Sequence, residues 1–162
     1  MSPLVRVVLV CGPAGAGKTT YARGLEREGY VRLSFDEEAW SLGHREHPLG
    51  TQTSDEVHRR LQHRLLEHVR RGEDVVVDTS FWSRASRDAY RKTLDPLGIQ
   101  PVVHYLDTPR DVVLARLARR RGETPDDVVV PFDQALAYLD GFEVPTLDEG
   151  PLVLCTVPTE EM

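Results

Sequence analysis

Apolar residues gather in five short runs along the chain. The runs cover residues 4–10, 30–35, 73–80, 100–107 and 152–157. Between them, apolar side chains recur at helical spacing in amphipathic stretches, at residues 20–27, 57–71, 84–94, 109–121 and 132–139. The runs predict buried strands, and the spacing predicts helices that each bury one face. Strands that alternate with helices indicate an α/β fold with a mostly parallel, five-stranded sheet.

Some positions predict where the helices begin. Residues 53–56 read Thr-Ser-Asp-Glu and fit a capping box at the start of the helix that runs to residue 71. Ser83 is a candidate N-cap for the helix over 84–94. Pro109 follows Thr108 and suits the first position of another helix.

The segment after the first run has the pattern of a phosphate-binding loop. Residues 12–19 fill every fixed position of G-x-x-x-x-G-K-[ST]. Glycines let successive backbone N–H groups point inward, and the helix that follows adds its positive end. Lys18 is expected to reach the β- and γ-phosphates, and the Thr19 hydroxyl to ligate Mg²⁺. The predicted nucleotide-binding residues here are Gly12, Pro13, Ala14, Gly15, Ala16, Gly17, Lys18, Thr19 and Thr20.

Two aspartates each close a predicted strand. Asp36 follows the run 30–35, and Asp78 lies near the end of the run 73–80. Ligands of open α/β sheets bind outside the carboxyl ends of the strands, so both carboxylates are expected beside the phosphate loop. Asp36 is the candidate general base for a hydroxyl, and the alternative is that it only caps a short helix. Asp78 is predicted to position the acceptor or to lie behind Mg²⁺, and it is the second candidate for the base.

Positive charge is concentrated in the first three quarters of the chain. The net charge is −6, yet all 20 Lys and Arg lie within residues 1–121, together with 16 of the 26 acidic residues. Residues 122–162 hold the other 10 acidic residues, which makes them a poor surface for nucleic acid. The arginine-rich side of the helix over 57–71 indicates either a solvated face or a contact for an anionic acceptor. Arg84 and Arg87 are further candidate acceptor contacts.

A second group of arginines ends the helix over 109–121. Cations at this end of a helix are favoured by the helix dipole. Beside a phosphate loop, arginine also supplies forked donors to a developing phosphoryl charge. We therefore predict an arginine-bearing lid over about residues 116–130.

The remaining features limit the class of protein. No apolar run approaches the roughly 20 residues of a membrane helix. Cys11 and Cys155 fall at or in predicted strands, so we expect reduced core residues in a cytoplasmic protein with a single domain over 1–162. His44 and His47 have the spacing of a metal pair, but no third ligand supports one, and the loop over 41–53 is a candidate for meeting the acceptor.

These segments resemble small P-loop kinases of the AAA_33 type. That group includes the 5′-kinase domain of phage-type polynucleotide kinase, chloramphenicol phosphotransferase and zeta-toxin-like kinases. The resemblance is carried by residues 12–19, 34–36, 77–80 and 142–146, and by Arg116 with Arg120.

The resemblance implies a three-layer P-loop NTPase fold of the kinase type. It implies that Asp36 deprotonates the acceptor, that Asp78 helps to orient it, and that Arg116 and Arg120 face the phosphates and take part in catalysis. Polynucleotide kinases have an arginine three residues after the catalytic aspartate. This chain has Ala39 there, which weakens the case for a polynucleotide acceptor.

The sequence therefore predicts a kinase that uses ATP and Mg²⁺. We expect Lys18 and the lid arginines to stabilise the transferred γ-phosphoryl group, and a small molecule with a hydroxyl group to accept it. The first alternative is a polynucleotide 5′-hydroxyl kinase. The second is a nucleotide-binding switch protein with weak ATPase activity.

Overall fold

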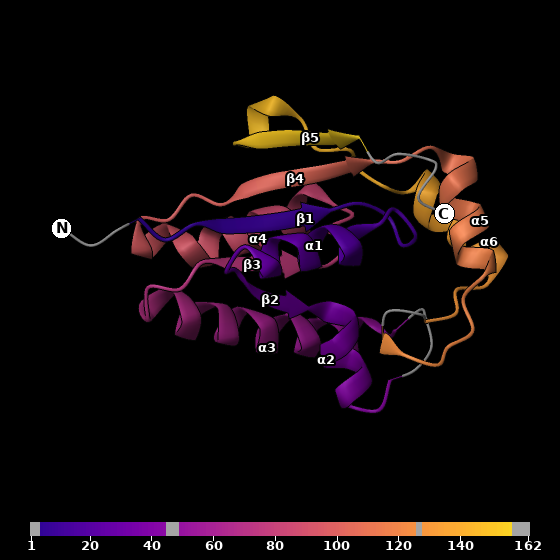
Figure 1. Ribbon diagram of the computed structural model, residues 1–162, viewed down its shortest axis with the longest axis horizontal. Helices are drawn as coiled ribbons and strands as arrows, with labels where there is room; N and C mark the ends of the chain where they lie inside the picture. The colour runs from indigo at the N-terminus through magenta and orange to yellow at the C-terminus, as the bar shows by residue number, and fades with distance from the viewer. Residues whose placement is uncertain (1–3, 45–48, 126–127, 157–162) are drawn as a thin grey trace.

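The computed structural model describes residues 4–44, 49–125 and 128–156 (Figure 1). Strands and helices alternate along most of the chain. The elements are β1 (Val7–Cys11), α1 (Lys18–Arg27), β2 (Val31–Ser34), α2 (Phe35–Ser41), α3 (Thr51–Arg70), β3 (Val75–Asp78), α4 (Arg84–Leu94), β4 (Val102–Asp107), α5 (Arg110–Ala118), α6 (Phe132–Asp140) and β5 (Leu152–Thr156), with 3₁₀ turns at Asp95–Leu97 and Leu147–Glu149.

The five strands form one sheet in the order β2-β3-β1-β4-β5. All four pairings are parallel, so the predicted α/β fold with a five-stranded sheet is confirmed. The chain first builds β2 and β3 on one side of β1 and then crosses to β4 and β5 on the other. A reversal of this kind leaves a crevice at the carboxyl end of the central strand, where ligands of such sheets bind.

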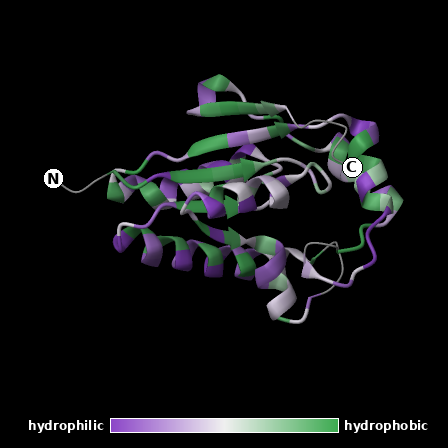
Figure 2. Cartoon of the chain, viewed as in Figure 1, coloured by the Kyte–Doolittle hydropathy of each residue, from purple (hydrophilic) through white to green (hydrophobic). Residues whose placement is uncertain are grey.

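The sheet buries a separate core on each face because alternate strand residues point to opposite sides. On one face, Leu9 and Val77 pack with Leu61 of α3 and Tyr90 of α4. On the other, Val8 packs in a cluster with Val10, Val76 and Ala22 of α1. Figure 2 shows the result as apolar strands between helices that also carry hydrophilic residues.

Helix starts agree with the sequence only in part. Ser83 caps α4 as predicted, in a reciprocal capping box with Ser86. The capping box predicted for residues 53–56 is wrong, because α3 already begins at Thr51 with Gly50 in extended conformation before it. Pro109 precedes α5 as its N-cap and is not its first helical residue.

Two helices stand beyond the carboxyl edge of the sheet. In Figure 1, α5 and α6 lie past the ends of the strand arrows, on the side where the loop between β1 and α1 also lies. Arg110 and Asp140 join the two helices through an ion pair of 3.0 Å. None of the described helices combines the length and the apolar character that a membrane span requires.

Candidate active site

The phosphate-binding loop joins the central strand β1 to α1. Gly15 and Gly17 have φ angles of 84° and 100°, in the region that favours glycine. A Cβ on Gly15 would lie 2.9 Å from the carbonyl oxygen of Val113, so α5 packs directly on the loop. The N–H of Gly12 donates to the carbonyl of Ser80 at 3.1 Å, and the Thr108 hydroxyl donates to the carbonyl of Ala16 at 2.7 Å. The segments that follow β3 and β4 thus hold the loop near both of its ends.

Lys18 and Thr19 open α1 directly behind the loop. The Lys18 ammonium donates to the carbonyl of Pro13 at 3.3 Å and therefore folds back over the loop. The Thr19 hydroxyl donates to Oδ2 of Asp78 at 3.1 Å. Asp78 ends the neighbouring strand β3 and is 4% exposed. The structure therefore brings Asp78 to the residue predicted to bind the metal.

Asp36 lies in the first turn of α2, immediately after β2. Ser34 is the N-cap of this helix and accepts a hydrogen bond from the N–H of Glu37. The alternative that Asp36 is only the cap of this helix is therefore wrong. Ser34 pairs with Asp78 in the sheet register, so both aspartates lie at the same sheet edge.

The charges of these residues act on one another. Burial lowers the pKa of Lys18, and the charges of Asp78 and Asp36 oppose that shift. Burial raises the pKa of Asp78, while Lys18 lowers it and Asp36 raises it. These effects agree with the sheet register and with the Thr19–Asp78 hydrogen bond, which place both aspartates at the carboxyl edge beside the start of α1.

The two predicted lid arginines lie by the same loop. Arg116 of α5 donates to the carbonyl of Gly15 at 3.3 Å. Arg120 donates to the carbonyl of Val128 at 3.3 Å, and its charge lowers the pKa of Lys18. Val128 and Val130 are buried, and Val130 packs with Val113 and Leu117 of α5.

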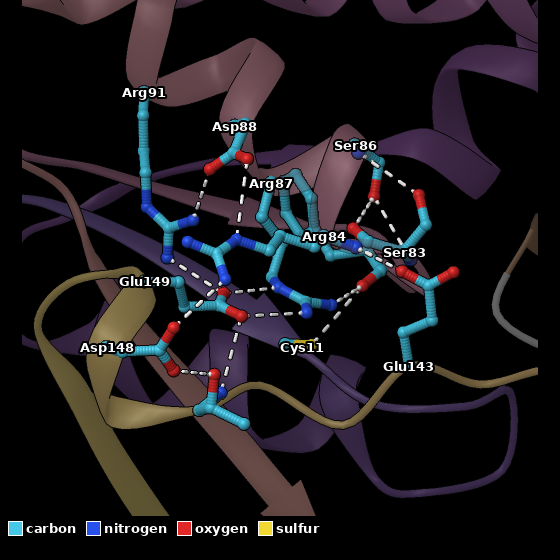
Figure 3. A network of polar contacts seen from close by, with 12 residues as sticks. Cys11, Ser83, Arg84, Ser86, Arg87, Asp88, Arg91, Glu143, Asp148 and Glu149 are labelled. Atoms are coloured by element: carbon cyan, nitrogen blue, oxygen red, sulfur yellow. Dashed lines mark hydrogen bonds and ion pairs between the residues drawn. The ribbon is translucent and has the colours of Figure 1, made fainter.

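The prediction that Arg87 contacts an acceptor is wrong, because its side chain is only 1% exposed and already bound. It donates to both carboxylate oxygens of Glu149, at 2.7 and 3.1 Å, and to the carbonyl of Phe81 at 2.7 Å. Figure 3 shows this network between α4 and the segment that leads into β5. Arg84 is partly exposed, but it is paired with Asp88 and Asp148 in the same network. The structure therefore gives no support to Arg84 as an acceptor contact.

The oxygen atoms of Thr19 and Asp78 beside the loop are suitable for a magnesium site. A hydroxyl and a carboxylate 3.1 Å apart are hard ligands of the kind that Mg²⁺ prefers, completed by water and phosphate oxygens. Among the described residues, no group of three His, Cys, Asp or Glu side chains could hold a metal by itself. His47 of the histidine pair lies outside the described residues.

The two cysteines lie in strands, with Cys11 buried in β1 and Cys155 half-buried in β5. Both are free thiols, as expected. Burial raises the pKa of Cys11, at the end of β1, to about 12, which leaves the thiol protonated and unreactive.

Two residues near the site were missed in the sequence. Arg32 of β2 is buried and bonds Oδ2 of Asp78 at 3.3 Å. Tyr138 of α6 is half-buried, and burial and then the charge of Asp36 raise its pKa. A charged residue inside a strand run was the available signal for Arg32. Tyr138 gave none, because an aromatic residue on an amphipathic helix usually belongs to the core.

The fold and the phosphate-binding loop together define a P-loop protein of the kinase type. A sugar kinase from Janibacter sp. HTCC2649 superposes with a TM-score of 0.74 at 22% identity, over 97% of this chain and 89% of the other. A gluconokinase from Sinorhizobium meliloti 1021 gives 0.69 at 22% identity, over 96% and 86%. The APS kinase of Mycobacterium tuberculosis, in complex with AMPPNP and APS, gives 0.66 at 21%, over 98% and 93%. No curated protein matches the chain.

Residues 7–145 match the AAA_33 family of AAA domains. The match covers the sheet from β1 to β4, the phosphate loop, both aspartates, and Arg116 with Arg120. The chain belongs to this family, and it is a P-loop kinase of the AAA_33 type.

Proposed function

We propose that this protein is an ATP-dependent kinase that transfers the γ-phosphoryl group to a hydroxyl of a small molecule. The observation that carries the proposal is the geometry of one sheet edge. The Thr19 hydroxyl, next to Lys18, bonds Asp78. Asp36 lies two residues after Ser34, which pairs with Asp78 in the sheet. A carboxylate beside a phosphate-loop lysine can accept the proton of a hydroxyl that attacks the bound triphosphate.

Each of the site residues has a separate role in the proposed reaction. The loop amides and Lys18 bind the phosphates, and Arg116 and Arg120 stabilise the charge that spreads over the moving group. The acceptor oxygen bonds to the γ-phosphorus, the bond to the bridging oxygen breaks and ADP leaves, while the hydroxyl proton passes to Asp36. Mg²⁺, when bound, would be held by Thr19 with Asp78 behind it and would neutralise phosphate charge.

Residues 116–130 form the lid in this proposal. Val130 packs the segment against the core that α5 and α6 share, and Tyr138 packs on the same core. The charge of Asp36 raises the pKa of Tyr138, after the larger effect of burial. Closure of the segment would exclude water and bring the arginines to the phosphates.

The charge of α3 bears on the polynucleotide alternative. A groove on its outer side is lined by Arg59, Arg60 and Arg64, but Glu56 and Glu67 line it as well. Glu56 pairs with Arg60 at 3.7 Å, so part of the positive charge is already neutralised. Ala39 is buried in α2 at the position where polynucleotide kinases carry an arginine. Both observations favour a small acceptor.

The first experiment is a transfer screen with γ-labelled ATP over nucleosides, sugars, antibiotics and oligonucleotides. We expect label on a small hydroxyl compound, with a rate that changes little with salt. A steep loss of acceptor affinity with salt would instead support a polynucleotide acceptor, because phosphate contacts release counterions.

The second experiment tests the base. Asp36→Asn should lower kcat by about 10²- to 10⁴-fold and leave ATP affinity within about threefold of wild type. The matched control is Asp133→Asn, an exposed acid in the first turn of α6, which should transfer like wild type. Full turnover by Asp36→Asn would defeat the assignment. A wild type that hydrolyses ATP slowly and labels no acceptor would support the switch protein instead.

A further inference from the structure

Arg32 lies inside the sheet but makes its contacts with groups around the active site. It is the second residue of β2, and its side chain is 6% exposed. Its Nη1 donates to Oδ2 of Asp78 at 3.3 Å, and its Nη2 pairs with Glu37 of α2. Its Nε is 3.9 Å from Glu26 of α1 and is buried without a hydrogen bond in the part of the chain described.

These contacts join the two sides of the site through one side chain. The same Oδ2 of Asp78 also accepts from the Thr19 hydroxyl. Glu37 is the direct neighbour of Asp36 in the first turn of α2. The guanidinium therefore spans from the carboxylate beneath the phosphate loop to the turn that carries the proposed base.

A purely structural role explains this arrangement poorly. Arg32 pairs with Val76 of β3 in the sheet register, and Val76 packs in a cluster with Ala22 of α1. An apolar side chain in place of Arg32 could pack against α1 in the same way. Burying an arginine there costs its hydration, and such a pair often adds no net stability over apolar packing. Its planar fork can, however, fix two carboxylates in direction as well as in charge.

We propose that Arg32 is a positioning residue for phosphoryl transfer, which holds Asp78 and the first turn of α2 in fixed relation so that Asp36 meets the phosphate loop correctly. The inference rests on the proposed kinase function. It assigns Arg32 no contact with substrate, because its contacts are with Asp78, Glu37 and Glu26.

The test replaces Arg32 and measures turnover, binding and local order together. Arg32→Gln should lower kcat about 10- to 100-fold, since small misplacements of reacting groups cost rates of this order. ATP affinity should stay within about threefold, because the loop amides and Lys18 bind the phosphates. Amide hydrogen exchange in the first turn of α2 should become faster, which reports the position of the turn without any turnover. Arg32→Lys keeps the charge but loses the fork, and should recover part of kcat.

The matched control is Arg64→Gln. Arg64 also pairs with a buried carboxylate of α2, Glu38, at 3.3 Å, but it reaches this carboxylate from α3. It should leave kcat unchanged. If the Arg32→Gln variant does not fold, the Glu37→Gln variant is tested in its place. Glu37 is 45% exposed, and its replacement removes only the ion pair between Arg32 and α2. We expect a roughly three- to tenfold fall in kcat.

The outcomes separate this inference from the function on which it rests. A wild type that labels no acceptor defeats the proposed function, and the exchange result alone then decides whether Arg32 holds the turn. An active wild type with Arg32→Gln equal to it in kcat, or with unchanged exchange in α2, overturns the positioning role. A fall in thermal stability alone, with kcat kept, would assign Arg32 to the fold.

Discussion

Two clusters of arginine and carboxylate side chains differ in which charge is in excess. The strap cluster consists of Arg87, Arg91 and Glu149, and joins α4 to the segment before β5 (Figure 3). There, two arginines share one carboxylate. The site cluster consists of Arg32, Glu37 and Asp78, and one arginine serves both carboxylates.

The two clusters differ in how far the surrounding charges offset the effect of burial on the pKa of the central carboxylate. Burial alone would raise the pKa of Glu149, but hydrogen bonds from Arg87 and Arg91 hold it below its usual range. Burial raises the pKa of Asp78, and the nearby charge of Asp36 adds to that rise. The strap cluster is therefore arranged for stability. The site cluster keeps a costly charge in place, as functional sites commonly do.

The largest expected effect is that of Glu149→Gln. The change leaves Arg87, 1% exposed, and Arg91, 15% exposed, without their shared carboxylate. We expect the free energy of unfolding to fall by about 3–5 kcal/mol, as for other broken buried pairs. Urea denaturation followed by circular dichroism measures the change.

A double variant provides the control for this loss. Arg87→Met with Glu149→Leu replaces the pair by apolar side chains and should be more stable than Glu149→Gln alone. A loss below about 1 kcal/mol in Glu149→Gln would mean that water already solvates the strap cluster, and the contrast with the site cluster would disappear.

Asp78→Asn should act on function more than on stability. The amide can still accept from Thr19 and Arg32, and it removes a buried charge that Asp36 repels. We expect kcat to fall about 10- to 100-fold, the usual cost of a lost partner behind a metal site. The free energy of unfolding should stay the same or rise. Transfer assays and urea titrations on one preparation test both expectations. A large loss of stability with kcat kept would place Asp78 with the strap cluster.

A third pair lies between the two extremes. The carboxylate of Glu38 in α2 is buried, whereas the side chain of its partner Arg64 is 54% exposed. Because water hydrates an exposed guanidinium and weakens its ion pair, Arg64→Gln should lower the free energy of unfolding by only about 1 kcal/mol. Arg60→Gln, in a half-exposed pair with Glu56 on the same helix, is the control and should change it by less than about 0.5 kcal/mol. Equal losses in both variants would show that burial of Glu38 contributes nothing.

The sequence predicts the phosphate loop and the sheet edge well because local requirements fix them. A loop with glycine at positive φ between a strand and a helix has few other conformations, and Gly15 and Gly17 adopt this one. Parallel strands then bring their carboxyl ends together, which is why Asp36 and Asp78 fall beside Lys18.

The partners of the arginines could not be predicted in this way. Arg87 is 62 positions from Glu149, and no local pattern links them. Arg32 stands in a strand, where alternation alone does not say which face meets a helix. In the sequence, Arg87 looks like an ordinary surface arginine, and the position of Arg32 inside a strand run does not identify the carboxylates that it meets. This is why Arg87 was wrongly given to the acceptor and Arg32 was missed.

The smallest effect concerns a partly buried histidine that bonds a tyrosine hydroxyl. His58 of α3 lies between Phe35 and Tyr90, and its Nδ1 is 2.9 Å from the Tyr90 hydroxyl. Burial lowers its pKa, against a weaker opposite effect of Asp55. The unfolded chain therefore takes up this proton first as the pH falls. The stability from neutral His58 is complete above the unfolded pKa of about 6.5 and is lost progressively below it.

We expect the free energy of unfolding to fall as the pH is lowered from about 7 to 5, and His58→Gln to flatten this dependence because Gln cannot titrate. Urea denaturation at each pH measures the slope. His104 is a second partly buried histidine, and burial lowers its pKa as well, so His58→Gln with His104→Gln should flatten the slope further. If His58→Gln leaves the slope unchanged, water reaches the imidazole ring of the folded protein. Burial of His58 would then cost no stability between pH 7 and 5.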